Sequence, residues 1–318
     1  MSQAAAIAAQ VQTAAEAGPS ATPSPVDRVR EVLSWPEERL DYAEAKLALD
    51  RAVDASIDSA ATIAKLNKLA EAALALAGLG ATSDARLKAL RTVVYESGPW
   101  NDYRPCAYDH SNIRGRNVRV KLISHYLETR LGDCVSMPVL FLILADKLGL
   151  DVALAASPLH LFVRYRAENS QVINLETTSG ALPARDVWIR QARPFSDRAL
   201  ANRIYMRTLS RREGVAAMAG VVLQHLNDRR RDEEAIAVTE LMLQQNPRDV
   251  HALANQGNAY GRLVQAEFLD KYPSKLLPSL LAAALPAAPG GQPRHLCEGR
   301  GAGMGTLRLI SHERQEPC

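Results

Sequence analysis

The sequence predicts an α+β protein, and three observations lead to this class. Apolar residues recur at helical spacing before residue 96 and again after residue 215. Strand-like alternation is confined to a central region, where LHLFVRYR and QVINLETT form the two arms of an expected hairpin. Between the first helices and this hairpin lies VLFLILADKLGL, an apolar run that predicts a buried helix.

Length, charge and cysteine content narrow the class of protein. A chain of 318 residues suggests two domains, or one domain with appendages. The formal charge of +3 and the lack of a long basic block predict no nucleic-acid partner, and no apolar run is long enough for a membrane span. Four cysteines are too few for a disulfide framework, and no export signal is visible at the N-terminus, so we expect a reducing, cytoplasmic location.

Changes of composition divide the chain into five segments. The first is rich in Ala, Ser, Thr and Pro, and the second shows helical spacing at Leu40, Ala43 and Leu47 and again from Ile63. The predicted segments are a disordered arm at 1–25, a helical N-terminal subdomain at 26–100, a mixed core at 101–200, repeat-like helices at 201–264 and a tail of uncertain structure at 265–318.

The repeat-like helices carry a recognisable pattern. The stretch DEEAIAVTELMLQQNPRDVHALANQGNAYGRL resembles one and a half tetratricopeptide repeats, with Ala235, Pro247, Gly257 and Tyr260 at the expected positions. Isolated repeats are unstable, so we expect these helices to pack onto the main domain. They are also a candidate surface for a protein partner.

The segment RLGDCVSMP places Cys134 immediately before the apolar helix. A thiolate is favoured at a helix N-terminus by unpaired N–H groups and by the helix dipole. Asp133 is a suitable helix cap, and the backbone N–H of Cys134 would be available as an oxyanion donor. The position therefore indicates a reactive cysteine.

A histidine and two candidate orienting groups follow on the predicted hairpin. His160 opens the first strand, and Asn174 and Glu176 lie on the second. The hairpin puts both beside His160, so either can accept a hydrogen bond from the imidazole and fix its tautomer. The logic is that of a triad of nucleophile, base and orienting group.

The three motifs GDCVSMPVLFLILADKLGL, LHLFVRY and NLETTSG together resemble the transglutaminase-like superfamily, specifically its SirB1-type branch. The resemblance implies a papain/transglutaminase-like core over 101–200, flanked by the helical N-terminal subdomain and a tetratricopeptide-like helical appendage. It also implies that Cys134 is the nucleophile, His160 the base and Glu176 the orienting acid. The family usually has an aspartate at the last position, so Asn174 stays open as an alternative. Many members of the branch lack the cysteine altogether.

The loop ESGPWNDYRPCAYDHSNIRGRN is long and aromatic, which is typical of loops that line sites. Trp100, Tyr103 and Tyr108 are its candidate cleft-lining residues. Strand alternation puts Arg164 on the face of His160, where it could meet an acidic group of a substrate.

No metal or other cofactor is expected. Cys106 and His110 could join Cys134 and His160 as zinc ligands, but structural zinc sites usually contain closely spaced cysteine pairs.

The expected function is thiol acyl chemistry on a peptide or protein amide. With water as the acyl acceptor the protein would be a peptidase or amidase, and with an amine it would be a transglutaminase. The alternative is a non-catalytic interaction protein that uses the same fold and the repeat-like helices to hold a partner.

Overall fold

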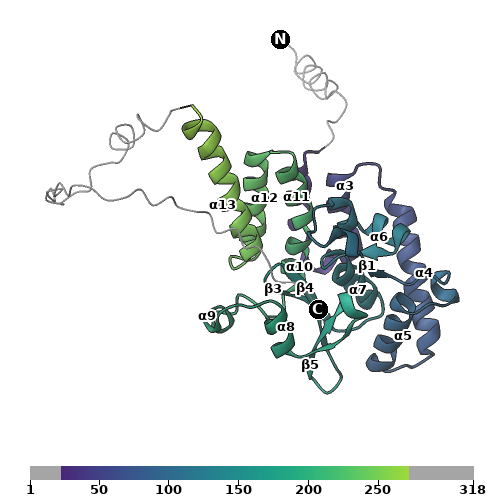
Figure 1. Ribbon diagram of the computed structural model, residues 1–318. Coiled ribbons are helices and arrows are strands. Elements are labelled where there is room, and N and C mark those ends of the chain that lie inside the picture. Colours follow the sequence, from purple (N-terminus) through teal and green to yellow (C-terminus); the bar gives the residue numbers. More distant parts are fainter. Residues whose placement is uncertain (1–22, 272–318) are drawn as a thin grey trace, which may run out of the picture. The chain divides into compact units, whose positions relative to one another are not determined.

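The computed structural model describes residues 23–271 (Figure 1). The predicted arm at 1–25 and the predicted tail at 265–318 lie almost entirely outside these residues. Where the arm is described, it has already become helical, because Ser24 is an N-cap and Pro25 begins the first described helix.

The first half of the described chain is helical, as the apolar spacing predicts. Its helices are α2 (Pro25–Leu33), α3 (Tyr42–Val53), α4 (Ser59–Ala77), α5 (Ser83–Tyr95) and α6 (Ile123–Thr129). The first four begin after a side chain that accepts a hydrogen bond from a first-turn amide, namely Ser24, Asp41, Asp58 and Thr82. Short 3-10 turns occur at η1 (Glu37–Arg39), η2 (Pro99–Asn101), η3 (His110–Asn112) and η4 (Val118–Lys121).

Residues 118–129 form two short helical elements instead of one helix. Leu122 has an extended backbone between η4 and α6, so the chain turns there instead of continuing as one helix. The amide of Ile123 donates to Asp50 of α3 at 2.9 Å, which fixes this break against the N-terminal helices.

The apolar run forms α7 (Ser136–Lys147), and its ten residues from Ser136 to Ala145 are all buried. A helix that is apolar on every side must be covered on every side. Helices α3, α4, α5 and α6 cover one part of its surface, and the sheet covers the rest. Phe141 of α7 stacks on Tyr95 of α5 with ring centroids 6.3 Å apart.

One four-stranded antiparallel sheet follows α7. Its strands are β3 (Val152–Ser157), β4 (His160–Arg166), β5 (Val172–Glu176) and β6 (Leu182–Ala184), in the order β3-β4-β5-β6. The predicted hairpin is confirmed as β4 and β5, with Val163 opposite Leu175. The 3-10 turn η5 (Thr177–Ser179) directly follows β5.

The two faces of the sheet belong to different apolar clusters. Leu154, Val163 and Leu175 pack into the large core that contains α7. Phe162, on the other face, belongs to a smaller cluster with Ala155, Ile189 and Met206. Period-two alternation of the side chains therefore decides which residues face α7.

A second, two-stranded sheet joins the aromatic loop to the segment before Cys134. Strand β1 (Ala107–Tyr108) runs parallel to β2 (Leu131–Gly132), and Tyr108 is the register partner of Gly132. A parallel pair forms here between segments more than twenty residues apart in the sequence, which brings Tyr108 close to Cys134.

The C-terminal part of the described chain is again helical. Its elements are α8 (Asp186–Ala192), α9 (Asp197–Ala201), α10 (Arg211–Met218), α11 (Gly220–Asp228), α12 (Asp232–Gln245), α13 (Val250–Val264) and a π-helical turn, η6 (Gln265–Leu269). Helices α11, α12 and α13 lie side by side (Figure 1).

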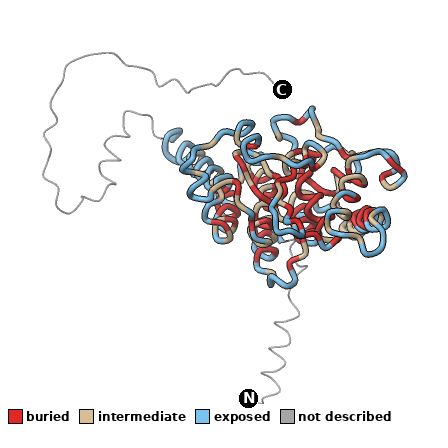
Figure 2. The backbone as a smooth tube through the Cα atoms, turned by 90° about the horizontal axis from the view of Figure 1, so that it is seen from below, coloured by how far each residue is buried: buried red, intermediate tan, exposed pale blue. Residues whose placement is uncertain are grey.

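The C-terminal helices share the apolar core of the N-terminal helices. Helices α10 and α11 pack on α3, and α12 packs on α2. One cluster of buried apolar residues extends from Val26 in α2 to Ala259 in α13. Figure 2 shows the buried positions gathered in the interior of this unit, which extends as far as Phe268. No helix among the described residues is long and apolar enough to cross a membrane.

Candidate active site

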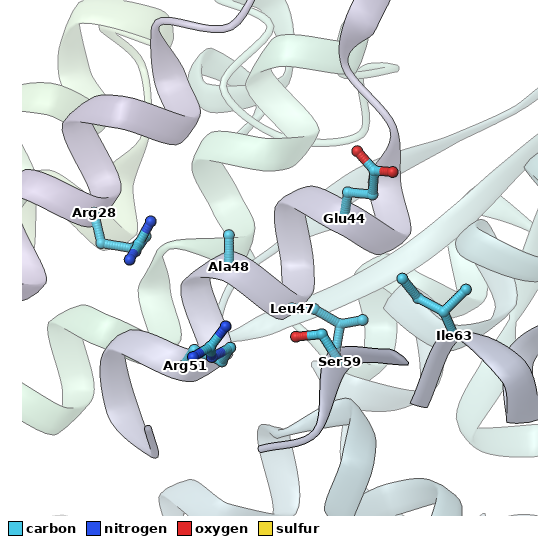
Figure 3. Close-up of a pocket in the computed structure, with 7 residues that line it drawn as sticks. All are labelled: Arg28, Glu44, Leu47, Ala48, Arg51, Ser59 and Ile63. Atoms are coloured by element: carbon cyan, nitrogen blue, oxygen red, sulfur yellow. The ribbon is translucent and has the colours of Figure 1, made fainter. Parts of the chain in front are cut away.

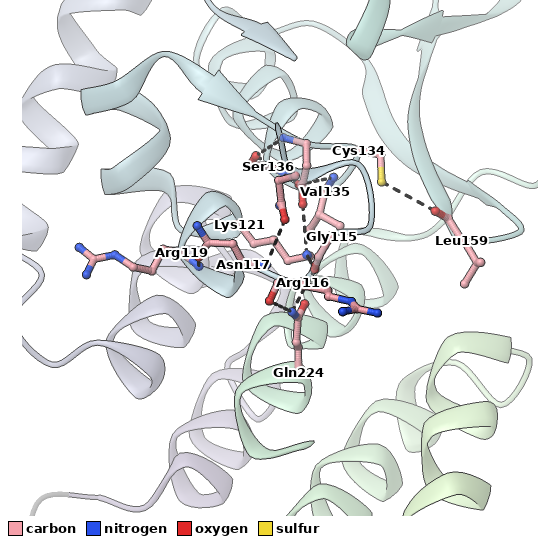
Figure 4. Close-up of polar contacts among 12 residues, drawn as sticks. Gly115, Arg116, Asn117, Arg119, Lys121, Cys134, Val135, Ser136, Leu159 and Gln224 are labelled. Carbon is pink, nitrogen blue, oxygen red and sulfur yellow. Dashed lines mark hydrogen bonds and ion pairs between the residues drawn. The ribbon is translucent and has the colours of Figure 1, made fainter. Parts of the chain in front are cut away.

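Cys134 lies in the short turn between β2 and α7, partly exposed to solvent. Its Sγ is 3.7 Å from the carbonyl oxygen of Leu159 in the turn between β3 and β4 (Figure 4). Leu159 has a positive φ of 56° and a side chain that is 85% exposed. A bulky residue in this backbone region is strained, and such strain concentrates at functional sites.

Gly132 precedes this turn, and neighbouring side chains lie too close to its backbone for a larger residue. A Cβ at Gly132 would lie 2.7 Å from a ring carbon of Tyr126 and 2.8 Å from Met137, so no larger residue fits. The chain can therefore pass between α6 and α7 immediately before the cysteine.

Asp133 organises the backbone on both sides of Cys134. It is 2% exposed, and its Oδ1 accepts hydrogen bonds from the amides of Val135 at 2.9 Å and Ser136 at 3.0 Å. Its own amide donates to the Ser136 hydroxyl at 3.0 Å. The N-cap position of α7 is Val135, so Asp133 lies two residues before the cap and still binds the first amides of the helix.

None of these hydrogen bonds involves the amide of Cys134. Within residues 23–271 it donates to no hydrogen-bond acceptor. A free N–H beside a nucleophile is the geometry that an oxyanion donor requires.

His160 begins β4 and is joined to Glu176 at the end of β5. Its Nε2–H donates to Oε2 of Glu176 at 2.7 Å, and the imidazole is 7% exposed. Burial opposes the charged imidazolium, but Cys134 and Glu176 outweigh it and raise the pKa of His160 to about 9. The other ring nitrogen, Nδ1, has no hydrogen-bond partner among the described residues. It is therefore free to exchange a proton with the nearby thiol.

Glu176 is held as a carboxylate. Burial acts to raise the pKa of this carboxyl, but hydrogen bonds from His160 and Thr178 bring it below its usual value. Its Oε1 accepts from the Thr178 amide at 3.0 Å and from the Thr178 hydroxyl at 2.6 Å. One carboxylate oxygen is thus anchored by the chain, and the other faces the imidazole.

Asn174 and Arg164 are engaged with each other instead of with His160. The Arg164 Nε donates to Asn174 Oδ1 at 2.9 Å, and the Asn174 amide donates to Ala184 O at 3.1 Å and Asp186 Oδ1 at 2.5 Å. The hydrogen bond of the imidazole therefore goes to Glu176 and not to the alternative orienter.

The aromatic loop contributes Tyr108 to the surroundings of Cys134. Burial, together with the negative charges of Cys134 and Asp133, raises the pKa of this phenol. Trp100 packs elsewhere, in the turn against α4 and α5, with its indole N–H bonded to Glu96 O at 3.1 Å. Tyr103 is 69% exposed, and no described contact joins it to the cysteine.

Two residues at the site, Lys121 and Thr178, were not predicted from the sequence. Lys121 has an Nζ that donates to Gly115 O at 2.7 Å and lies 3.1 Å from Asp133 Oδ2. Nothing in the local pattern points from Lys121 to Asp133, because the contact depends on how η4 packs. Thr178 could have been found, because a Thr two residues after an acidic side chain commonly closes a local turn with it.

No metal-binding cluster is found at this site within the described residues. Among the described residues, no group of three or more His, Cys, Asp or Glu side chains could hold a metal ion. A pocket of about 270 Å³ opens between α2, α3 and the start of α4, away from Cys134 (Figure 3). Its lining residues are Arg28, Glu44, Leu47, Ala48, Arg51, Ser59 and Ile63.

A cysteine before a helix and a His–Glu pair on two neighbouring strands form the arrangement seen in folds that carry a cysteine nucleophile. Comparison with protein families shows to which of these folds the chain is similar. The transglutaminase-like superfamily, in its core 2 form, matches residues 60–218, which is half of the chain and includes Cys134, His160 and Glu176. The protein belongs to the transglutaminase-like superfamily. Searches of curated proteins and of solved structures found no match.

Proposed function

We propose that this protein is a cysteine-dependent enzyme that transfers or hydrolyses the acyl group of a peptide or protein amide. The observation that carries the proposal is the His160–Glu176 hydrogen bond at 2.7 Å, with the unpartnered Nδ1 left for Cys134. A base is useful to a thiol only when its tautomer is fixed, and Glu176 fixes it by accepting from Nε2.

Acylation begins with the Cys134 thiolate and the His160 imidazolium. Sγ forms a bond to the carbonyl carbon of the amide, and the oxygen takes negative charge beside the Cys134 N–H. The carbon–nitrogen bond then breaks, and His160 gives its proton to the leaving amine. The products of this step are a thioester on Cys134 and a neutral imidazole.

Deacylation reverses the role of the imidazole. Water or an amine attacks the thioester carbon, His160 takes the proton of the attacking group, and the carbon–sulfur bond breaks. Water yields a carboxylic acid and an amine yields a new amide. The acceptor is decided by how well the cleft excludes water.

Narrower assignments form part of the same proposal. The three sequence motifs support the SirB1-type branch, and the pairing of α12 with α13 supports tetratricopeptide-like character for 201–264. The free thiols of Cys106 and Cys134 support a reducing, cytoplasmic compartment.

Thiol reactivity tests the catalytic proposal. The protein is treated with iodoacetamide near pH 6, and each modified cysteine is quantified by peptide mass spectrometry. We expect Cys134 to be alkylated about tenfold or more faster than Cys297 and Cys318, since an ordinary thiol is almost wholly protonated at this pH. His160→Gln should remove the difference. Equal rates for the three thiols, unchanged by His160→Gln, would overturn the proposal.

A second candidate function is supported by one feature of α13. This helix exposes a stripe of large apolar side chains, namely Val250, Leu253, Tyr260 and Val264. Such a stripe suits a non-catalytic interaction protein that holds a partner on its C-terminal helices. That function requires binding that survives Cys134→Ser and is lost on Leu253→Glu, with no turnover of any bound peptide.

A further inference from the structure

Lys121 is a buried cation beside the nucleophile turn. It is 8% exposed, and its ammonium lies 3.1 Å from Asp133 Oδ2, as an ion pair that is not aligned as a hydrogen bond. Its aligned hydrogen bond goes to Gly115 O at 2.7 Å. A lysine is rarely buried without a partner whose charge requires it.

Asp133 is the negatively charged partner of Lys121. Its carboxylate is buried and adjacent in sequence to Cys134, so its negative charge opposes formation of a thiolate there. The same carboxylate is needed to hold the amides of Val135 and Ser136. The turn therefore contains an anion that shapes the site and, without a counter-charge, would weaken the nucleophile.

We propose that Lys121 is a positioning residue for Cys134, whose ammonium both anchors Asp133 and cancels its charge beside the thiolate. The inference rests on the proposed function, because it concerns the reactivity of the same cysteine. Lys121 acts through Asp133, and it need not touch the substrate.

Lys121 is itself held from several sides. Its carbonyl accepts from the buried Lys46 ammonium at 2.9 Å, and Lys46 is paired with Asp50. Gly115 O, which accepts from Lys121, also accepts from Gln224 of α11 at 3.0 Å. The ammonium is therefore fixed between the N-terminal helices and α11, and it is preorganised for Asp133.

Among the described residues, several other charged or titratable groups lie near this turn. His160, Asp133 and Tyr108 surround Cys134, and Asp109 and Arg193 act on Tyr108 from further away. On the side of α13, Lys121 and Asp249 both act on His251. Among these groups Lys121 is the cation that contacts Asp133.

The test is the pH dependence of Cys134 alkylation by iodoacetamide in the full-length protein, measured for Lys121→Met, Asp133→Asn and the double variant. With Lys121→Met, the uncompensated charge of Asp133 should raise the midpoint of the pH profile of Cys134 alkylation by about one pH unit. With Asp133→Asn, the remaining ammonium should lower it. The double variant should return it to within about 0.3 unit of wild type, because both charges are gone. Lys121→Arg, which keeps the charge, should stay close to wild type.

An unchanged midpoint in Lys121→Met overturns the inference. So does a double variant that is as impaired as Lys121→Met, because the effect would then come from packing and not from charge. If circular dichroism shows that Lys121→Met does not fold, the test rests on Asp133→Asn. In that case the inference is overturned when the midpoint pH of Cys134 alkylation in Asp133→Asn is not lower than in wild type. The proposed function fails differently: the wild-type midpoint would itself lie near 8.5, the value of an ordinary thiol, and would not respond to His160→Gln.

Discussion

At the scale of single residues, the site is governed by one hydrogen bond between two ionised side chains. Glu176 accepts from His160 at 2.7 Å, and each partner shifts the pKa of the other toward the charged form. The pair is mostly buried, so water screens it less than a surface pair. Its charge state therefore contributes to stability as well as to reactivity.

The pH dependence of stability should report this pair. The pKa of His160 is raised from 6.5 to about 9, so its contribution is complete below pH 6.5 and is lost as the pH rises through 9. The pKa of Glu176 is lowered from 4.5, so its contribution is complete above pH 4.5 and is lost on further acidification. The difference in free energy of unfolding between wild type and His160→Gln should thus be largest between pH 4.5 and 6.5, at most about 3 kcal/mol.

Urea unfolding at pH 5.5 and pH 9.5 measures this difference. The exposed His110 provides the matched control, since His110→Gln removes a histidine that lies outside the pair. A His160→Gln effect that grew between pH 5.5 and pH 9.5 would contradict the assigned sign.

At the scale of elements, α7 is both the centre of the core and the support of the turn that contains Cys134. Its buried residues run without interruption from Ser136 to Ala145. It packs on the N-terminal helices and on the sheet, including β4, which carries His160. The precision of the site therefore depends on the packing of this helix.

A single truncation in α7 should be costly. Leu142 is fully buried, and Leu142→Ala removes apolar contacts and leaves a cavity, so we expect a loss of about 2–5 kcal/mol in the free energy of unfolding. Leu79 is fully exposed, and Leu79→Ala should change stability by less than about 0.5 kcal/mol. Chemical denaturation of both variants checks this, and similar small effects would show that α7 is not the tightly packed centre described here.

At the scale of the whole described unit, the C-terminal helices are joined to the N-terminal ones through Arg211 of α10. Its guanidinium binds the Asp146 carboxylate of α7, donates to Leu40 O at 3.0 Å and lies 4.1 Å from the ring centroid of Tyr42. Burial acts to lower the pKa of Arg211, but the hydrogen bond and the charge of Asp146 outweigh it and raise this pKa. One side chain of α10 thus contacts two segments that are distant from it in the sequence, at Leu40–Tyr42 and at Asp146.

Loss of this contact should weaken the whole unit. We expect Arg211→Met to lower the free energy of unfolding by about 1–3 kcal/mol, because a bidentate ion pair, a backbone hydrogen bond and a cation–π contact are lost together. Arg198 of α9 is exposed, and Arg198→Met serves as the control. Far-ultraviolet and tyrosine signals should shift together in urea; separate transitions would mean that the C-terminal helices unfold on their own.

Local patterns predicted much of this architecture. Helical spacing predicted α3, α4 and α7, and alternation predicted the β4–β5 hairpin with His160 at its start. These features depend on neighbours within one element, so the sequence alone carries them. No local pattern indicates the break between η4 and α6, because it depends on Asp50, which is far away in the sequence.

What the sequence by itself determined is which elements carry Cys134, His160 and the two candidate orienting groups, because helix and strand periods are local properties. It could not choose between Asn174 and Glu176, since residues two apart on a strand share one face. Only the tertiary structure shows that Glu176 is the one that hydrogen-bonds to His160. Strand register places Asn174 opposite Arg164, and Glu176 then lies nearer the strand end where His160 begins. The same holds for Lys121, whose contact with Asp133 exists only once η4 packs beside the turn that contains Cys134.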